Sequence, residues 1–328
     1  MTRDDVLNML WQNADRYVSG EELARALSLS RTAVWKTVGQ LRAEGYAIES
    51  RPKRGYRLLS GSDVLSAEGV LRHLRRRDLR LRVYKTISST NTVLKTLAAE
   101  GEEPGLVLIS EEQSAGRGRL GRSFYSPPGS GLYMSLLLRP AMPAAEATRL
   151  TVCAAVAVCE TVEELSGRDA QIKWVNDVFV DGRKVCGILT EASVDCESGA
   201  LHYVVVGIGV NTRVPEGDYP EELRGVAGSA FGEEAIPELR CRLAAGILDR
   251  LADYAENPAA PAIFEGYRRR SLVLGREISI LAPGRDPVPA VAVDLDEDCS
   301  LLARLPDGSI RRLSSGEVSV KPRNESGE

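Results

Sequence analysis

Residues 111–129 read EEQSAGRGRLGRSFYSPPG and follow the apolar segment 106–110, for which the sequence predicts a strand. The glycines from 116 to 121 match the dinucleotide-binding spacing G-x-G-x-x-G, and residues 116–123 nearly match a P-loop, with Arg122 where that motif has lysine. Both motifs need a helix to begin at the glycines, so that its amide groups receive a phosphate. Here the sequence SPPG follows instead, and no acidic residue lies about twenty positions further on to hold a ribose. The segment is therefore predicted to be neither motif.

The arginines of this loop, Arg117, Arg119 and Arg122, alternate with its glycines. Backbone amides and guanidinium groups on so flexible a segment can surround anionic oxygen atoms. Condensing a carboxylate with the α-phosphate of ATP forces two anions together, so the transition state needs positive charge and exclusion of water. The pattern therefore predicts a mobile lid over a reaction of this kind.

The segments around the loop alternate between strand and helix patterns. Strand patterns begin at Leu79 and recur at 106–110, 131–139, 170–175, 185–192 and 201–208. Helices are predicted at 90–100, which Ser89 can cap, and at 144–165, whose Ala, Val and Cys content suits packing on a sheet. The expected fold class is α+β, with helices on a mixed sheet.

Two polar clusters, residues 173–177 and residues 183–184, interrupt the apolar strands where a pure core would not tolerate them. The Asp181-Gly182 pair between them predicts a tight turn, so that the clusters face each other across a hairpin. Buried lysines are rare unless an anion pairs with them. Two interpretations follow: a ligand site, or a structural salt bridge from one of the lysines to Asp177. The small residues of 207–211 are compatible with close backbone packing alone.

The first sixty residues have the spacing of a helix-turn-helix followed by a wing. Apolar positions at helical intervals predict successive helices, the third of which Ser30 can cap. Its inward face would consist of Val34, Val38 and Leu41. Two short strands, 46–50 and 55–59, then flank the basic turn 51–54 and predict the wing.

This module is basic, although the chain as a whole is acidic. Residues 31–57 contain seven Lys or Arg and two Glu, whereas the whole chain has a formal net charge of −4. Because the third helix and the wing are basic together, DNA is favoured over the alternative of a winged-helix domain that binds protein. The residues expected to contact DNA are Arg31, Thr32, Lys36, Arg51, Lys53 and Arg54.

The composition, 43% hydrophobic and 27% charged over 328 residues, predicts a soluble protein of two or three domains. The sequence contains no apolar run of 18 residues and no apolar core of a signal peptide, so we expect a cytoplasmic protein without a membrane partner. The six cysteines form no C-x-x-C pair and are expected to be reduced and mostly buried. With only His73 and His202 as histidines, the chemistry is expected to depend on lysine, arginine and backbone amides.

Over essentially its whole length the chain resembles the bifunctional biotin protein ligases, also called biotin operon repressors. The motifs that carry the resemblance, in the family's order, are Ser89-Thr90-Asn91, Gln113 with the loop 116–122, residues 173–177, residues 183–189, and residues 207–211. The resemblance implies a winged helix-turn-helix at 1–62, a biotin- and ATP-binding catalytic domain similar to class II synthetases at 63–272, and an SH3-like barrel at 273–328. Short strands of that barrel are expected around Ile278, Val291, Leu301, Ile310 and Val318.

The resemblance implies a ligase that forms biotinyl-5'-adenylate from biotin and ATP, with Mg²⁺, and transfers biotin to a lysine of an acceptor domain such as a carboxylase carrier protein. With the adenylate as corepressor, a homodimer would bind operator DNA and repress biotin genes. One alternative is a repressor that senses a ligand without turnover. Another is a lipoate or octanoate ligase, a family that shares the central fold but lacks the winged helix and the arginine-glycine loop.

The resemblance also implies roles for single residues. Those expected to bind biotin are Ser89, Thr90, Asn91, Gln113, Arg117, Gly118, Arg119 and Lys184. Those expected to face the nucleotide are Arg122, Phe124, Lys173, Asn176 and Asn211. Arg119 would retain the reactive adenylate, Lys184 would polarise the reacting carboxylate and α-phosphate, and Asp177 would pair with Lys184 or Mg²⁺.

Two positions depart from the family pattern. Val175 stands where the family usually has proline, and Phe124 stands where it usually has a tryptophan that packs over the adenine. Phenylalanine can still stack on a base, so weaker nucleotide packing and unchanged chemistry are expected.

Overall fold

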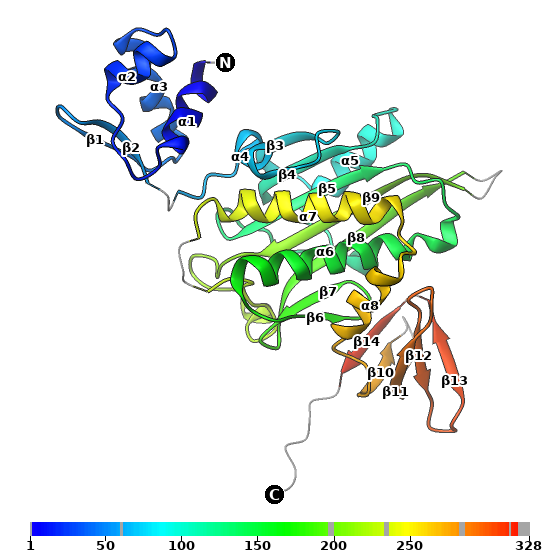
Figure 1. The fold of residues 1–328 in the computed structure, drawn as a ribbon. Helices are drawn as coiled ribbons and strands as arrows, with labels where there is room; N and C mark the ends of the chain where they lie inside the picture. The colour runs from blue at the N-terminus through cyan, green and yellow to red at the C-terminus, as the bar shows by residue number, and fades with distance from the viewer. Residues whose placement is uncertain are drawn as a thin grey trace, which may run out of the picture. The chain divides into compact units, whose positions relative to one another are not determined.

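The computed structural model describes residues 2–59, 62–195, 200–232, 236–281, 286–314 and 316–320. Contacts within the chain group residues 1–75 with 233–245, and residues 76–232 with 246–328 (Figure 1). This grouping follows packing, and the three domain ranges expected from the sequence remain predictions.

The N-terminal unit contains the helix-turn-helix and the wing, as predicted. Its helices are α1 (Thr2–Gln12), α2 (Gly20–Ala26) and α3 (Arg31–Ala43), and its hairpin pairs β1 (Ile48–Arg51) with β2 (Gly55–Leu58) antiparallel. The Ser30 Oγ accepts a hydrogen bond from the Ala33 N–H at 3.1 Å, which fixes the start of α3. Val34, Val38 and Leu41 lie in the core, so the opposite face of α3 is left to solvent.

The segment after the wing packs within the same unit. It forms α4 (Ala67–His73), and the first residues of α7 (Leu239–Glu256) lie against it. Arg240 donates from its backbone N–H and its Nε to the Asp63 carboxylate at 2.9 and 3.0 Å. A Cβ on Gly69 would lie 2.6 Å from the Cys241 Sγ, so only glycine allows this approach.

The second unit is built on a mixed sheet in the order β3-β4-β5-β9-β8-β7-β6. Its strands are β3 (Arg80–Ile87), β4 (Leu106–Gln113), β5 (Gly131–Leu138), β6 (Ala170–Lys173), β7 (Asp177–Val180), β8 (Arg183–Val194) and β9 (Leu201–Asn211). β3 and β4 are parallel, and the other neighbours are antiparallel. The mixed sheet predicted from the sequence is thereby confirmed.

Helices pack on this sheet. Helix α6 (Thr148–Ser166) is buried at every residue from Leu150 to Cys159 and packs against β6, β7, β8 and β9 (Figure 1). Helix α5 (Thr90–Ala99) packs against Tyr203 and Val205 of β9. Since side chains alternate along a strand, Gly207 and Gly209 face the same side of the sheet as these two residues. Helix α8 (Pro261–Arg269) completes this part of the fold.

The C-terminal strands form a separate antiparallel sheet in the order β13-β12-β11-β10-β14. They are β10 (Glu277–Leu281), β11 (Val288–Leu295), β12 (Leu301–Arg304), β13 (Ile310–Leu313) and β14 (Glu317–Val320), at the positions predicted from the sequence. The Trp174 Nε1 donates to the Cys299 carbonyl at 3.0 Å, which attaches this sheet to the end of β6.

The cysteines of the described residues are free and buried, at 153, 159, 186, 241 and 299. Cys196 lies outside the described residues. Burial raises the pKa of Cys299 to about 11 and that of Cys153 to about 12, so these thiols stay protonated at neutral pH and are poor nucleophiles.

Neither a metal-binding cluster nor a helix that could span a membrane is found among the described residues. They contain no group of three or more His, Cys, Asp or Glu arranged to hold a metal ion. Across the same ranges, no helix combines the length and the apolar character needed to cross a bilayer.

Replacing Ser30 with alanine removes the N-cap of α3 and is expected to destabilise the helix by about 1 kcal/mol. Hydrogen exchange of the first-turn amides of α3 would measure the loss. Ser30→Gly is the matched control, since glycine at an N-cap costs only a few tenths of a kcal/mol relative to serine. Equal protection in wild type and Ser30→Ala would show that the cap does not hold this helix end.

Candidate active site

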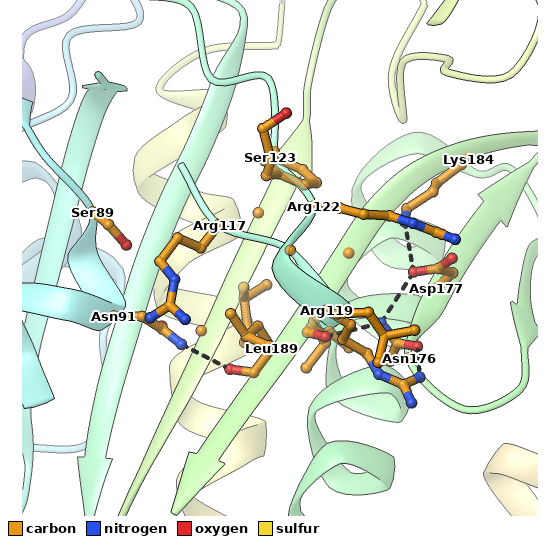
Figure 2. A pocket seen from close by; sticks show the side chains of 18 of the residues that line it. Ser89, Asn91, Arg117, Arg119, Arg122, Ser123, Asn176, Asp177, Lys184 and Leu189 are labelled. Carbon is orange, nitrogen blue, oxygen red and sulfur yellow. Dashed lines mark hydrogen bonds and ion pairs between the residues drawn. The ribbon is translucent and has the colours of Figure 1, made fainter. Parts of the chain in front are cut away.

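A cavity lies beneath the arginine-glycine loop, on the face of the sheet where β8 and β9 carry glycines (Figure 2). The residues predicted to bind ligands that line it are Ser89, Thr90, Asn91, Gln113, Arg117, Gly118, Arg119, Arg122, Phe124, Lys173, Asn176, Asp177 and Lys184. Asn211 is not among the described residues that line it. It ends β9, where it pairs with Gly131 of β5.

One end of the cavity is a buried polar network around the start of α5. The Gln113 Oε1 accepts from the Thr90 N–H at 2.9 Å and lies 3.2 Å from the Thr90 Oγ1. The Ser135 Oγ lies 2.7 Å from that hydroxyl and 2.6 Å from the Asn91 Oδ1. The Gln113 Nε2 donates to the Ser126 Oγ at 3.0 Å. The network therefore fixes donors and acceptors in one arrangement before any ligand arrives.

Glu191, on β8, holds this end of the site together. Its carboxylate accepts from the Lys95 Nζ at 2.7 Å, the Asn91 Nδ2 at 3.1 Å and an Arg117 guanidinium nitrogen at 3.2 Å. Burial raises the pKa of Glu191, but the hydrogen bonds from Lys95 and Asn91 and the neighbouring positive charges outweigh it, so the pKa is lowered overall. A carboxylate that is charged at neutral pH thus keeps Arg117 at the cavity wall.

Glu191 and Ser135 were not singled out from the sequence. Ser135 had a signal, because it is a polar residue inside the otherwise apolar run that forms β5. Glu191 had none, since it stands near the exposed end of a long strand where a charged residue is ordinary.

Glycines in β8 and β9 leave room for two side chains, those of Asn91 and Phe124. A Cβ on Gly207 would lie 2.0 Å from the Asn91 Oδ1, and one on Gly209 would lie 2.5 Å from the Phe124 ring. A Cβ on Gly187 would lie 3.1 Å from the same ring. The small-residue segment therefore does more than permit backbone packing, because it leaves room for the Phe124 side chain, which lines the cavity.

The other end of the cavity is formed by the hairpin of β7 and β8 and by the turn before β7. The Lys184 Nζ lies 2.7 Å from the Asp177 Oδ1, which also accepts from the Asn176 Nδ2 at 3.2 Å (Figure 2). The Arg119 guanidinium donates to the Asn176 Oδ1 at 2.6 Å and to the Gly316 carbonyl at 2.8 Å. The predicted hairpin is confirmed, and the salt bridge considered as its structural explanation is present inside the ligand cavity.

The loop itself contains no helix that begins at its glycines. Residues Arg119–Gly121 form a single 3-10 turn, in which Leu120 has a left-handed φ of 56°. The Gly118 N–H donates to the Arg122 carbonyl at 2.7 Å, and the Phe124 N–H donates to the Gly116 carbonyl at 2.9 Å. This geometry confirms the exclusion of the dinucleotide-binding and P-loop motifs.

The cavity has a marked excess of positive charge. Among its described lining residues the cations are Arg117, Arg119, Arg122, Lys173 and Lys184, and the carboxylate is that of Asp177 alone. With apolar atoms from Phe124, Trp174 and Ile188 in the same walls, the site suits a ligand that combines an apolar body with several anionic oxygens.

Comparisons with known proteins agree with this geometry. Residues 83–211 match the biotin/lipoate A/B protein ligase family, residues 2–57 match a helix-turn-helix domain, and residues 273–321 match the biotin protein ligase C-terminal domain. Among solved structures, a biotin protein ligase from Aquifex aeolicus in complex with biotin and ATP superposes with a TM-score of 0.61 at 28% identity, over 74% of this chain and 98% of that one.

Two curated relatives are bifunctional ligase/repressors named BirA. The one from Bacillus subtilis is 37% identical over 237 residues, which are 71% of this chain and 72% of the relative. The one from Escherichia coli is 28% identical over 306 residues, which are 92% of each chain. This chain therefore belongs to the biotin protein ligase family, in its bifunctional ligase/repressor branch.

Proposed function

We propose that this chain joins biotin to ATP as biotinyl-5'-adenylate and then transfers the biotinyl group to a lysine of an acceptor protein domain. The observation that carries the proposal is the concentration of five Lys or Arg side chains against one carboxylate among the described lining residues of a single cavity. The first step brings a carboxylate and a phosphate together, and it needs this excess of charge.

The buried network around Thr90, Asn91 and Gln113 supplies the fixed donors and acceptors that a cyclic urea requires. Phe124, held over Gly187 and Gly209, supplies a ring on which adenine can stack. With biotin at the first position and the base at the second, the reacting carboxylate and α-phosphate would meet between Arg117 and Lys184, which Figure 2 shows on opposite sides of the cavity.

In the first step a biotin carboxylate oxygen bonds to the α-phosphorus, and the bond from that phosphorus to the bridging oxygen breaks, releasing pyrophosphate. Lys184 would neutralise charge on both reacting groups, exchanging its bond to Asp177 for bonds to substrate oxygens. In the second step the acceptor lysine amine bonds to the acyl carbon, AMP leaves, and the amine proton passes to solvent. Arg119, Gly118 and the rest of the loop would exclude water from the adenylate between the steps.

We propose Asp177 as the protein ligand of a Mg²⁺ ion that arrives with ATP. One or two carboxylates together with substrate phosphates and water are the usual ligands of this ion, and Asp177 is the carboxylate among the described lining residues. The ion would supply charge neutralisation at the phosphates. Lys184 would then be released from Asp177 to reach the substrate.

For Lys184→Ala we expect adenylate synthesis to fall by a factor of roughly 100 or more, the scale for loss of one transition-state charge contact. The assay supplies biotin, ATP and a biotin-acceptor domain, and it follows both pyrophosphate release and label on the acceptor lysine. Arg183→Ala is the matched control, because Arg183 is an exposed neighbour on the same strand that does not line the cavity.

Near-normal synthesis by Lys184→Ala would contradict the role of Lys184. A wild-type protein that binds DNA and labels no acceptor would instead be the ligand-sensing repressor, and the ligase proposal would fail. Competition with lipoate in the same assay separates a biotin site from a lipoate site.

For Arg119→Gly we expect adenylate to leak into solution and to label lysines of bystander proteins, because the loop loses its anchors on Asn176 and Gly316. Mass spectrometry of biotinylated lysines in a mixture of acceptor and unrelated protein measures this selectivity. The double variant Arg119→Gly/Lys184→Ala should label neither, since it makes no adenylate to lose. Unchanged selectivity in Arg119→Gly would refute its retention role.

We further propose that the winged helix binds operator DNA as a homodimer when the adenylate is bound, and that the chain would act as a repressor in this form. The support within this chain is electrostatic, because the guanidinium groups of Arg51, Arg54 and Arg57 gather within 5.4 Å of the Tyr17 ring centroid at the base of the wing. Acceptor and operator would meet this protein in the cytoplasm, where buried reduced thiols persist.

Replacing Lys53 and Arg54 together with alanine should weaken DNA binding uniformly across sequences. The slope of log affinity against log salt should fall by about 1 for each phosphate contact removed. Arg25→Ala is the control, because Arg25 is exposed on α2 and already pairs with Glu21 at 3.4 Å. A slope identical to wild type in the double variant would place the wing away from the phosphates.

A further inference from the structure

Trp35, on α3, is 65% exposed to solvent, although the residues on the other face of this helix pack in a buried hydrophobic core. Its neighbours on α3 divide by face: Val34 and Val38 are buried, whereas Arg31, Thr32 and Lys36 are exposed with Trp35. Trp35 contributes nothing to the core of the described unit. The indole is therefore free to contact a partner that approaches this face of α3.

Gly39 lies one turn after Trp35, on the same face of α3. A Cβ at this position would meet nothing within 4 Å, so neither packing nor backbone conformation in this structure requires glycine. Glycine inside a helix is nevertheless less favourable than any residue except proline. The missing side chain leaves space in which a group outside the helix can come close to its backbone.

The charges around this face identify the class of partner. Arg31 and Lys36 border Trp35 on α3, and the basic turn of the wing adds exposed Arg51, Lys53 and Arg54. A partner with dense negative charge and a groove wide enough for a helix is duplex DNA. Among the groups that base edges present in the major groove, the apolar one is the C5-methyl of thymine.

We propose that Trp35 reads thymine methyl groups in the major groove, and that Gly39 leaves the space that lets the next turn of α3 approach the groove wall. This inference rests on the DNA binding proposed above. It goes further by naming the residue that discriminates and the base feature that it contacts, where Arg31, Lys36 and the wing supply mainly attraction to phosphate.

The experiment uses the full chain with biotin and ATP. Duplexes are first selected from a random-sequence pool by the wild-type protein, and each thymine of the selected site is then replaced by deoxyuridine, which lacks only the methyl group. At one or more positions wild-type affinity should fall by roughly fourfold, the change expected when a contact with one buried methyl-sized group is lost. Trp35→Ala should bind the thymine and uracil versions equally.

Two further variants complete the cycle. Gln40→Ala, an exposed change on the same helix, should keep the full methyl dependence of wild type. Gly39→Ala should raise the thermal midpoint of the N-terminal unit and yet weaken binding to the selected duplex, because it strengthens the helix and fills the gap.

A methyl effect of the same size in Trp35→Ala and wild type would overturn the proposal. Failure of the wild type to enrich any duplex is a different result, which removes the DNA-binding function and this inference with it. Enrichment without methyl dependence at any thymine leaves DNA binding standing and refutes the role of Trp35 alone.

Discussion

Repulsion among the cations of the cavity is the constraint on which the rest of the site depends. Arg117, Arg119, Arg122, Lys173 and Lys184 converge on one space, and in the absence of substrate they must be held apart. Asp177 binds Lys184 at one end, and Glu191 binds Arg117 at the other. These two carboxylates hold two of the five cations in place, and the positive charge that remains in excess is available to the phosphate and carboxylate of the substrates.

The sheet beneath the cavity must also leave space for the substrates. A site that must hold a cyclic urea, an acyl chain and a nucleotide needs depth, and two neighbouring antiparallel strands can provide it only by omitting side chains from one face. Gly187, Gly207 and Gly209 place no side chain on the cavity face. The residues next to them along the strands are apolar and buried, and they point to the opposite face, which α6 covers. Asn91 and Phe124 then occupy the space that the glycines leave.

Much of this arrangement could be predicted from the sequence, because it depends on interactions between residues that are close together in the chain. Ser30 and Ser89 cap helices three residues from their partners, the SPPG segment excludes a helix after the loop, and the Asp181-Gly182 turn pairs β7 with β8. The role of Glu191 could not be predicted, because its partners lie on α5, 96 and 100 residues away in the sequence, and on the loop, 74 residues away. Asn211 was expected at the nucleotide from motif order alone, but its strand position pairs it with Gly131 and leaves it outside the described cavity wall.

The C-terminal sheet contacts the arginine-glycine loop and lines part of the cavity. Arg119 donates to the Gly316 carbonyl just before β14, and Val318 of that strand lines the cavity. Trp174, close to the hairpin of β7 and β8, donates to the Cys299 carbonyl just before β12. An arginine on a glycine-rich loop has too many conformations to shield a hydrolysable adenylate unless fixed acceptors receive it. Asn176 from the turn before β7 and Gly316 from just before β14 are those acceptors, so both segments must be in place before the loop can exclude water.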